Sequence, residues 1–490
     1  MNLLAFDLGG SSGKLFLAEY SNGQISYQEI HRFENSPCPI NGGLYWDIIY
    51  LYRQMNEGIK KAIRLTGDQI DSFGIDSFCN DFGFIDKNGE LISPVRCYRD
   101  NRTERYQSEI YKTMTRKQLY ARNGNQISPV NTLMQLAAMK AAGQDPLFGY
   151  GHKMLFIPDL FHFFLTGCAN SEYTISSVSQ MYHYQKEDWD HEILSAYDFP
   201  REMFCSLIEP GTKIGNTQPS YNAQMKTKGF PTFAVCEHDT ASAFIASSCQ
   251  EDCVIISSGT WSLIGIEVKQ PIISEETYRY NFANEGGYKD RHRLLRCIMG
   301  LWYIEEIKKY FEAQGQAYGF DELDQLAKSA PAFRYLIDVD DDSFFQPGDI
   351  PEKIAAFCME HDQSRPEAIG EYVRCIYESL AMKYRWIIEK LEKVVHKPLP
   401  VINIVGGGSK ADILCQFTAD ACNKPVLAGP ANASAIGNLS VQLVAVEAAE
   451  TIEQAKELML HTYRIKTYLP KDTERWELAY QAYLQKNSLD

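Results

Sequence analysis

Short apolar runs alternate with polar turns at the start of the chain. Leu3 to Asp7 is an apolar run of strand length, and Leu15 to Tyr20 is a second. Ile25 to Phe33 follows Ser21-Asn22-Gly23, and an Asn-Gly pair between two such segments is a strong hairpin signal. The pattern therefore predicts three consecutive strands with no helix between them.

Helical spacing of apolar residues begins after these strands. From Trp46 to Leu65 the apolar side chains recur at three- and four-residue intervals, which predicts an amphipathic helix. The residues expected on or near its buried face are Ile49, Leu51, Met55, Ile59 and Ile63. Further strands are predicted at Asp71 to Ser77 and Asp81 to Ile85, and the stretch from Gln118 to Gly167 is predicted to be mostly helical.

The second half of the chain repeats the outline of the first. Val254 to Ser258, a Gly-Thr turn and Ser262 to Glu267 predict another pair of strands joined by a glycine turn. This repetition predicts two similar α/β domains around a cleft. We place the division at residues 1–243 and 244–490.

A long helix and a buried strand complete this second half. Ser364-Arg365-Pro366-Glu367 has the form of a capping box with an early proline, so the helix is predicted to start there. Val401 to Val405 is predicted as a buried strand. It leads through Gly406-Gly407-Gly408 into a helix from about Lys410, and three glycines allow a flat ligand or a phosphate to approach the backbone.

Composition restricts the possible partners. The chain has 490 residues, enough for two domains with separate cores, and its net charge is 48 − 63 = −15 with a pI near 5.3. No cluster of Lys and Arg opposes this acidic balance, which argues against nucleic acid and anionic membranes as partners. No apolar run is long enough to span a bilayer. The start of the chain lacks the basic and apolar regions of a signal peptide.

The thirteen cysteines show no CxxC pairs and no histidines at metal-ligand spacing. We expect mostly reduced, buried thiols and no zinc site. These features predict a cytoplasmic protein, and we expect it to be a monomer or a homodimer.

The candidate chemistry lies near the middle of the chain. Phe230 to Val235 is predicted as a buried strand, with a helix expected from about Ala241 to Ser247. Between them, at the strand's carboxyl end, stand His238, Asp239 and Thr240. Ligands collect at such strand ends in open α/β sheets, and a carboxylate together with glycine turns indicates phosphoryl transfer. The alternative for Asp239 is an ordinary helix N-cap.

The first glycine loop, Gly9-Gly10-Ser11-Ser12-Gly13-Lys14, excludes two common nucleotide sites. A P-loop ends in Gly-Lys-Ser/Thr before a helix, whereas Leu15 follows Lys14 here and begins a strand. A dinucleotide fold is excluded for the same reason, because no strand-helix-strand unit surrounds these glycines.

The order of four elements resembles the FGGY carbohydrate kinases, a branch of the actin-like ATPase superfamily. The elements are Phe6 to Lys14, His238-Asp239-Thr240, Ser257-Ser258-Gly259-Thr260 and Val405-Gly406-Gly407-Gly408. A narrower resemblance, to the branch that phosphorylates rhamnulose, depends on Tyr98-Arg99-Asp100, Asn284 to Gly287, Ile298 to Trp302, Ala419 to Cys422 and Ala428-Gly429-Pro430. The resemblance implies two actin-like ATPase (ribonuclease H-like) domains with an interdomain catalytic cleft. The first domain would hold the sugar and the first phosphate loop, and the second would hold the nucleotide.

The resemblance also implies a role for each matching residue. Asp239 would be the general base, with His238 and Thr240 as sugar contacts, and Asp7 would orient Mg²⁺ through water. The ATP-binding positions would be Gly10, Ser11, Ser12, Gly13, Lys14, Thr260, Glu305 and Gly407. The activity implied is ATP- and Mg²⁺-dependent phosphorylation of O1 of L-rhamnulose. The alternatives are its C4 epimer L-fuculose as substrate, or a regulator that binds sugar or nucleotide without catalysis.

Three positions depart from the pattern of that branch. Cys79 stands where a sugar-contacting glycine is expected, and Cys297 where a sugar-contacting asparagine is expected. Glu305 replaces a glutamine on the nucleotide side. The catalytic and phosphate positions are intact, so these departures bear on which sugar is used rather than on kinase activity.

Overall fold

The computed structural model describes residues 1–150, 152–249, 252–344 and 348–489. They form two compact units, and each unit is assembled from three segments of the chain. The first contains Met1–Ala246, Glu267–Leu294 and Ala433–Tyr463; the second contains Ser247–Ile266, Leu295–Asn432 and Arg464–Asp490. The division at residues 243 and 244 stays a prediction.

A six-stranded sheet with the order β14-β15-β6-β1-β2-β3 forms the centre of the first unit. β1 pairs antiparallel with β2 and parallel with β6. The three strands predicted at the amino terminus are confirmed. The bounds of the six strands are β1 (Asn2–Leu8), β2 (Ser12–Ser21), β3 (Gln24–Glu34), β6 (Ser72–Ser77), β14 (Lys213–Asn216) and β15 (Pro231–Phe233).

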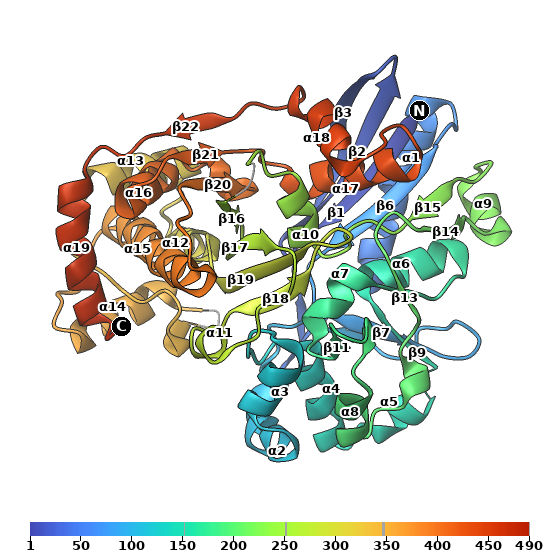
Figure 1. Cartoon of the computed structure of the whole chain (residues 1–490), viewed down its shortest axis with the longest axis horizontal. Coiled ribbons are helices and arrows are strands. Elements are labelled where there is room, and N and C mark those ends of the chain that lie inside the picture. Colours follow the sequence, from blue (N-terminus) through green and yellow to red (C-terminus); the bar gives the residue numbers. More distant parts are fainter. Residues whose placement is uncertain (151, 250–251, 345–347, 490) are drawn as a thin grey trace. The chain divides into compact units, whose positions relative to one another are not determined.

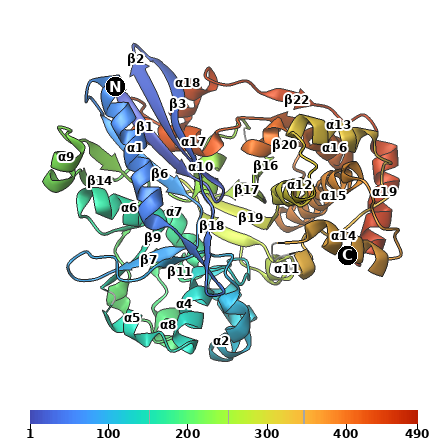
Figure 2. The same cartoon turned by 180° about the vertical axis from the view of Figure 1, so that it is seen from behind.

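Helices cover both faces of this sheet. Figure 1 shows α17 (Ala433–Ala445) and α18 (Ile452–Leu460) over the first strands, and Figure 2, from behind, shows α1 (Ile48–Thr66) across the same strands. Alternation along β6 fits this arrangement. Phe73 contacts His162 of α6 (Ile157–Thr166) on one face, and the next residue, Gly74, faces α17 on the other.

Shorter elements complete the first unit. They are β4 (Cys38–Ile40), β5 (Gly43–Trp46), β7 (Phe82–Ile85), β8 (Val95–Arg96), α2 (Gln107–Thr113), α3 (Arg116–Asn123), α4 (Thr132–Ala141), α5 (Asp145–Tyr150), β9 (Lys153–Phe156), β10 (Ser171–Glu172), α7 (Tyr173–Ser176), β11 (Tyr182–His183), β12 (Asp188–Trp189), α8 (His191–Ala196), β13 (Leu207–Ile208), α9 (Pro219–Met225), α10 (Asp239–Ile245), α11 (Glu275–Arg279) and β18 (Ala283–Gly286).

The second unit repeats the strand pairing of the first. β16 (Cys253–Ser258) pairs antiparallel with β17 (Trp261–Val268) and parallel with β20 (Val401–Val405), as β1 does with β2 and β6. β21 (Val426–Ala428) and β22 (Lys466–Tyr468) extend the order to β17-β16-β20-β21-β22. The predicted duplication of a strand-turn-strand element is therefore confirmed at the level of topology.

The helices of the second unit pack around these strands. They are α12 (Trp302–Ala313), α13 (Phe320–Ser329), α14 (Ile350–Glu360), α15 (Ile369–Val395), α16 (Asp412–Cys422) and α19 (Thr473–Lys486). β19 (His292–Met299) precedes α12, and short 3₁₀ turns include Gly407–Lys410. The predicted capping box of the long helix is wrong, because α15 begins at Ile369. The carboxylate of Glu371 accepts from the backbone N–H groups of Glu367 and Ala368 instead.

One other expectation about an element needs correction. Ile49, predicted on or near the buried face of α1, is 70% exposed, because the helix turns Leu51, Met55 and Ile59 toward the sheet. The stretch from Gln118 to Gly167 is mostly helical, as predicted, and it also contains the strand β9, which pairs with β7. The apolar residues of α15 recur at three- and four-residue spacing, which predicts a buried stripe, and all of them are buried: Ile369, Val373, Ile376, Leu380, Tyr384, Ile387 and Leu391.

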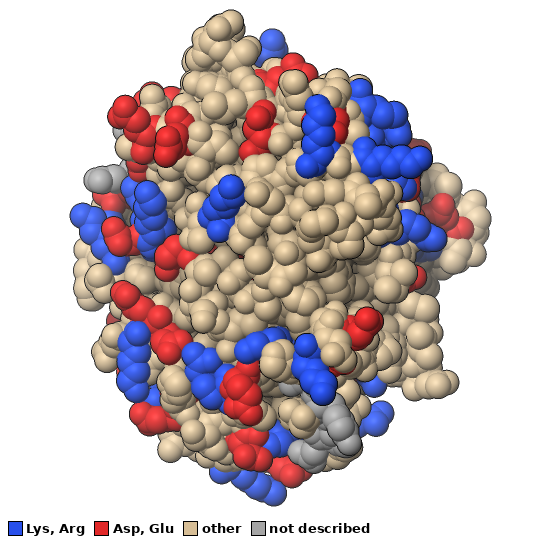
Figure 3. Space-filling model, turned by 90° about the vertical axis from the view of Figure 1, so that its right-hand side faces the viewer, with Lys and Arg blue, Asp and Glu red and all other residues tan. Residues whose placement is uncertain are grey.

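Most of the cysteines carry thiols, as predicted, but one pair is oxidised. Cys249 and Cys253 form a disulfide, and the other cysteines carry thiols. Within the described ranges no helix is long and apolar enough to cross a membrane. On the face shown in Figure 3, Lys and Arg side chains gather at the upper right, and elsewhere they lie among Asp and Glu side chains.

Candidate active site

The first glycine loop is a tight turn between β1 and β2. The N–H of Gly9 donates to the carbonyl of Ser12 at 2.9 Å, and Asn35 Nδ2 donates to the carbonyl of Gly9 at 2.9 Å. At Gly13 a Cβ atom would lie 2.1 Å from the ring of Phe33, so only glycine allows this ring to pack on the strand. These contacts thus hold the loop in place at the carboxyl end of β1.

Carboxylates gather at the end of β1 beside this loop. Asp7 lies opposite Lys14 across the hairpin, and Lys14 Nζ is 3.4 Å from Asp7 Oδ2. Asp76 is the neighbour of Asp7 on the parallel strand β6 and is completely buried. Burial raises the pKa of Asp76 well above its ordinary value. The charge of Asp7 raises it further, and the hydrogen bond from Asn438 Nδ2 at 2.7 Å opposes the shift.

The strand end that carries His238 and Asp239 is fixed through its backbone. The N–H of Ser77 donates to the carbonyl of Glu237 at 2.9 Å, which joins this segment to the end of β6. The N–H of His238 donates to Thr174 Oγ1 at 3.3 Å. His238 is the N-cap of α10 and Asp239 is its first residue, so the alternative that Asp239 is merely the cap is wrong.

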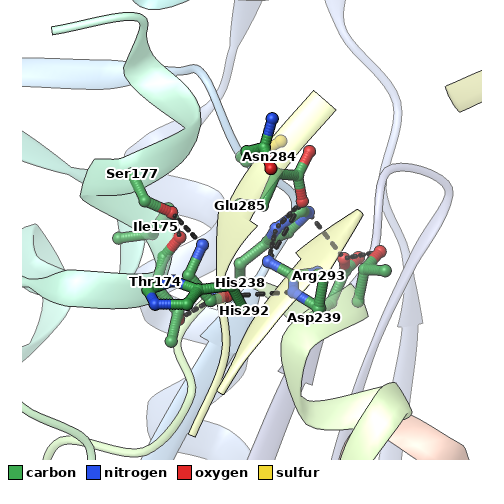
Figure 4. A network of polar contacts seen from close by, with 12 residues as sticks. Thr174, Ile175, Ser177, His238, Asp239, Asn284, Glu285, His292 and Arg293 are labelled. Atoms are coloured by element: carbon green, nitrogen blue, oxygen red, sulfur yellow. Dashed lines mark hydrogen bonds and ion pairs between the residues drawn. The ribbon is translucent and has the colours of Figure 1, made fainter. Parts of the chain in front are cut away.

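His238 and Asp239 belong to a four-residue polar network with Glu285 and Arg293. Figure 4 shows the four side chains converging from α10, β18 and β19. His238 Nε2 lies 3.6 Å from Asp239 Oδ1, and His238 Nδ1 lies 3.1 Å from Arg293 Nη2. Arg293 Nη2 lies 3.0 Å from Glu285 Oε2.

The pKa values of the two carboxylates in this network are shifted in opposite directions. Burial raises the pKa of Asp239, and His238 reduces this shift while the charge of Asp7 adds to it. Burial also acts to raise the pKa of Glu285, but the Arg293 guanidinium opposes it, and that pKa lies below its ordinary value. Asp239, whose side chain is 27% exposed, is the one suited to accept a proton.

The second glycine turn packs against the triple glycine within the second unit. At Gly408 a Cβ atom would lie 2.1 Å from Ser258 Oγ, and Gly406 has φ near +79° while facing the carbonyl of Ser258. The carbonyl of Thr260 accepts from the N–H of Gly300 at 3.0 Å. The turn that holds Thr260 and the turn that holds Gly407 are therefore neighbours, as close backbone approach to a nucleotide requires.

The predicted residues fall into two groups. The first unit contains Asp7, the first loop, Cys79, His238, Asp239 and Thr240. The second unit contains Thr260, Cys297, Glu305 and Gly407. Thr240 Oγ1 donates to Asp239 Oδ1 at 3.1 Å. Cys297 on β19 and Glu305 on α12 are both half-buried. Their predicted contacts with sugar and nucleotide stay predictions.

Sequence reasoning missed the residues that surround His238. Glu285 belongs to the motif Asn284 to Gly287 but has no predicted role, and nothing distinguishes Arg293 in the charged stretch from Lys289 to Arg293. The one signal in the sequence is a charged residue directly before the apolar pair Leu294-Leu295. Its complete burial and its pairing with His238, 55 residues earlier, depend on the tertiary fold.

The residues at the end of β1 suit a magnesium ion that is shared with other ligands. In the part of the chain that the structure describes, no three His, Cys, Asp or Glu side chains are grouped to hold a metal by themselves. Asp76 Oδ1 nevertheless has no hydrogen-bond partner among the described residues, and it lies beside Asp7. Mg²⁺ favours one or two carboxylates completed by phosphate and water, which fits this pair.

These features define a class of protein, the phosphotransferases that act by positioning and charge neutralisation. Comparison with known families agrees. The profile of the N-terminal domain of the FGGY family of carbohydrate kinases matches residues 2–246, and that of its C-terminal domain matches residues 254–446. The chain belongs to the FGGY family of carbohydrate kinases.

Individual relatives cover nearly the whole chain. It is 36% identical over 465 residues to a rhamnulokinase of Oceanobacillus iheyensis, covering 95% of this chain and 97% of the relative. It is 37% identical to a rhamnulokinase of Pectobacterium atrosepticum, covering 96% and 93%.

Solved structures show the same fold at low identity. A ligand-bound xylulose kinase of Lactobacillus acidophilus aligns with a TM-score of 0.80 at 16% identity, covering 99% of this chain and 97% of that one. A glycerol kinase of Plasmodium falciparum with ADP aligns with a TM-score of 0.77 at 14% identity, covering 100% and 98%.

Proposed function

We propose that this protein is an ATP- and Mg²⁺-dependent kinase that transfers the γ-phosphoryl group of ATP to O1 of L-rhamnulose. The observation that carries the reaction is the Asp239 carboxylate, fixed at a strand-to-helix junction, partly open and with a raised pKa. The choice of sugar is supported by the relatives named rhamnulokinase, which are 36–37% identical over nearly the full length. We propose the cytoplasm, where ATP is supplied, as its compartment.

Asp239 acts as the general base. Its carboxylate accepts the proton of the O1 hydroxyl as the bond from O1 to phosphorus forms, and the bond from phosphorus to the ADP oxygen breaks. A raised pKa brings the carboxyl closer to the working pH, which favours proton transfer in the transition state. Thr240 donates to Oδ1 of the same carboxylate and keeps it oriented.

The glycine turns hold the nucleotide in this proposal. The backbone from Gly10 to Gly13 and the Lys14 ammonium hold the phosphates, with Thr260 as a further donor. Gly407 leaves room for the adenosine, and Glu305 lies on the nucleotide side. Asp7, with Asp76 behind it, would hold Mg²⁺ through water, and the ion would neutralise charge on the phosphate oxygens.

A panel of acceptors tests the function. ADP release is measured with L-rhamnulose, L-fuculose, D-xylulose and glycerol under identical conditions, and L-rhamnulose should give the highest kcat/KM. Asp239→Asn should keep ATP binding and lower kcat by about 10²–10⁴-fold. A higher kcat/KM for L-fuculose would overturn the assignment of the sugar. Near-normal turnover of the variant would remove Asp239 from the mechanism.

A further inference from the structure

Arg293 is a fully buried cation beside the candidate base. Its Nε donates to the carbonyl of Gly286 at 2.9 Å, and its guanidinium carbon lies 5.7 Å from the centre of the Phe244 ring. Its Nη2 pairs with Glu285 Oε2 at 3.0 Å. These contacts leave the guanidinium one orientation, and Glu285 compensates its charge, as a buried cation requires.

This orientation aims Nη2 at the ring of His238. The distance from Arg293 Nη2 to His238 Nδ1 is 3.1 Å, which is that of a hydrogen bond. A guanidinium has only donors and stays protonated at every working pH. His238 Nδ1 must therefore be the acceptor, and a neutral ring then carries its proton on Nε2.

The other tautomer fits the geometry less well. Nδ1–H would have to donate to Glu285 Oε2, which lies 3.5 Å away, beyond a normal hydrogen bond. It would also point a second N–H toward the guanidinium at the shorter distance. The proximity of Arg293 thus selects the Nε2–H form.

We propose that Arg293, compensated by Glu285, is a positioning residue that fixes His238 as the Nε2–H tautomer and so reserves the role of base for Asp239. Nε2 lies 3.6 Å from Asp239 Oδ1, on the side of the ring away from the Nδ1 contact. With a proton there, His238 presents an N–H donor to the acceptor hydroxyl of the sugar. Without it, the lone pair of an imidazole, intrinsically more basic than a carboxylate, would compete with Asp239 for the same proton. The inference rests on the proposed function only in naming Asp239 as the base.

The tautomer is measured directly. Protein labelled with ¹⁵N in its ten histidines is examined by long-range ¹H–¹⁵N correlation at neutral pH, and a His238→Gln variant identifies the signal of His238. In the wild-type protein Nδ1 should resonate as an unprotonated nitrogen and Nε2 as a protonated one. The double variant Arg293→Met/Glu285→Gln removes both charges together and should lose this preference. Glu285→Gln alone is the matched control, because it keeps the Arg293 donor and should keep the Nε2–H form.

Kinetics give a second readout. The double variant should lower kcat for the sugar by about 3- to 10-fold, the effect of one hydrogen bond, while KM for ATP stays unchanged. A wild-type His238 protonated on Nδ1 would overturn the proposal, and that measurement needs no charge variant to fold. A double variant that melts like the wild type and keeps the Nε2–H signal would overturn it as well. Failure of the protein to phosphorylate any sugar of the panel would refute the proposed function but would leave the tautomer result standing.

Discussion

At the scale of single residues, two cysteines stand where related kinases are expected to contact the sugar. Cys79 is half-buried, its sulfur accepts from Asn80 Nδ2 at 3.2 Å, and it packs against the core around α4. Cys297 is half-buried on β19. Cys79 therefore has a packing role of its own.

Cys297→Asn is predicted to change the preference between epimeric sugars. An amide offers two donors and an acceptor where a thiol offers only weak ones. If residue 297 contacts the sugar, the ratio of kcat/KM for L-rhamnulose over L-fuculose should shift by roughly 3- to 10-fold, which corresponds to about 1 kcal/mol. Cys38→Asn, the same change on the exposed strand β4, should leave the ratio as it is. An unmoved ratio in Cys297→Asn would exclude residue 297 from sugar recognition.

A second residue-scale feature is a set of carboxyl groups buried behind His238. Asp159, Glu172 and Glu237 are at most 3% exposed. Burial raises the pKa of all three, that of Glu172 to about 8. Glu172 Oε2 accepts from the backbone N–H groups of Ile175 and Glu237, so it fixes the segment just before His238 and Asp239.

Glu172→Gln should stabilise the protein at high pH. The folded state binds the Glu172 proton more tightly than the unfolded chain, whose pKa is near 4.5. Its contribution to stability is therefore full below pH 4.5 and is lost as pH rises toward 8, at up to about 1.4 kcal/mol per pH unit. Glutamine keeps an oxygen in the place of Oε2 and never ionises. Urea midpoints at pH 6 and pH 9 should diverge in favour of the variant as pH rises, whereas Glu450→Gln, an exposed control, should show no such trend. A constant difference between the two pH values would contradict a neutral Glu172.

The residues of the site differ in how readily the sequence predicts their roles. His238 and Asp239 were predictable because a strand end followed by a helix is a local pattern, and Gly10 to Lys14 because the turn is local too. The roles of Glu285 and Arg293 were not predictable, because the sequence of a charged stretch does not show whether the fold buries it or leaves it in water. Only the fold decides that these two charges lose their water and must pair.

At the scale of elements, α10 and α17 pack with their backbones in near contact. A Cβ atom at Gly437 of α17 would lie 1.8 Å from the carbonyl oxygen of Ser242 in α10. Two side chains of α17 then reach the sheet. Asn438 Nδ2 donates to Asp76 and Gln442 Nε2 donates to the carbonyl of Leu4 at 2.8 Å. The helix that begins with Asp239 is thus held from behind by α17.

Gly437→Ala is predicted to destabilise the protein, because a backbone carbonyl cannot move aside as a flexible side chain does. Overpacking of this kind costs about 1–3 kcal/mol. Thermal melting should show a lower Tm, and kcat should fall with it because α10 carries Asp239. Gly149→Ala in α5 is the matched control: a Cβ there meets open space, so the substitution should be neutral or slightly stabilising. A Gly437→Ala variant with the Tm of the wild type would show that α10 and α17 separate easily.

Elements were predictable where their signals are local. The strands at the amino terminus and around residue 260, and the buried stripe of α15, follow from periodicity alone. β9 was missed because it has only four residues and lies between helices, and its strand state comes from pairing with β7. The start of α15 was misplaced because the Glu371 side chain, and not a Ser364 cap, closes the first turn.

At the scale of the whole molecule, the first unit is not continuous in sequence. Its sheet is formed by residues before Ala246, but α17, which covers one face of β1 and β6, comes from Ala433–Tyr463. A fragment of residues 1–246 lacks this helix. The apolar face of its sheet and the buried carboxyl of Asp76 would then meet water.

The fragment 1–246 is therefore predicted not to fold by itself. It should bind the dye ANS, lack near-UV circular dichroism and show no cooperative melt, while the full chain shows the opposite in each assay. Adding a peptide of residues 433–463 is the matched test, because it restores the missing helix and should reduce dye binding. A cooperative melt of the fragment alone would show that the covering helix is dispensable.

Because α17 lies late in the sequence, it is synthesised well after the sheet that it covers. The 186 residues from 247 to 432 must be translated before this helix exists, which at 5–20 residues per second takes roughly ten to forty seconds. During that interval the nascent sheet carries an open apolar face next to the segment that will position Asp239. A chaperone that binds exposed strands should meet the growing chain in this window. Slowing elongation between residues 247 and 432 should therefore lower the yield of native protein, whereas slowing it after residue 463 should not.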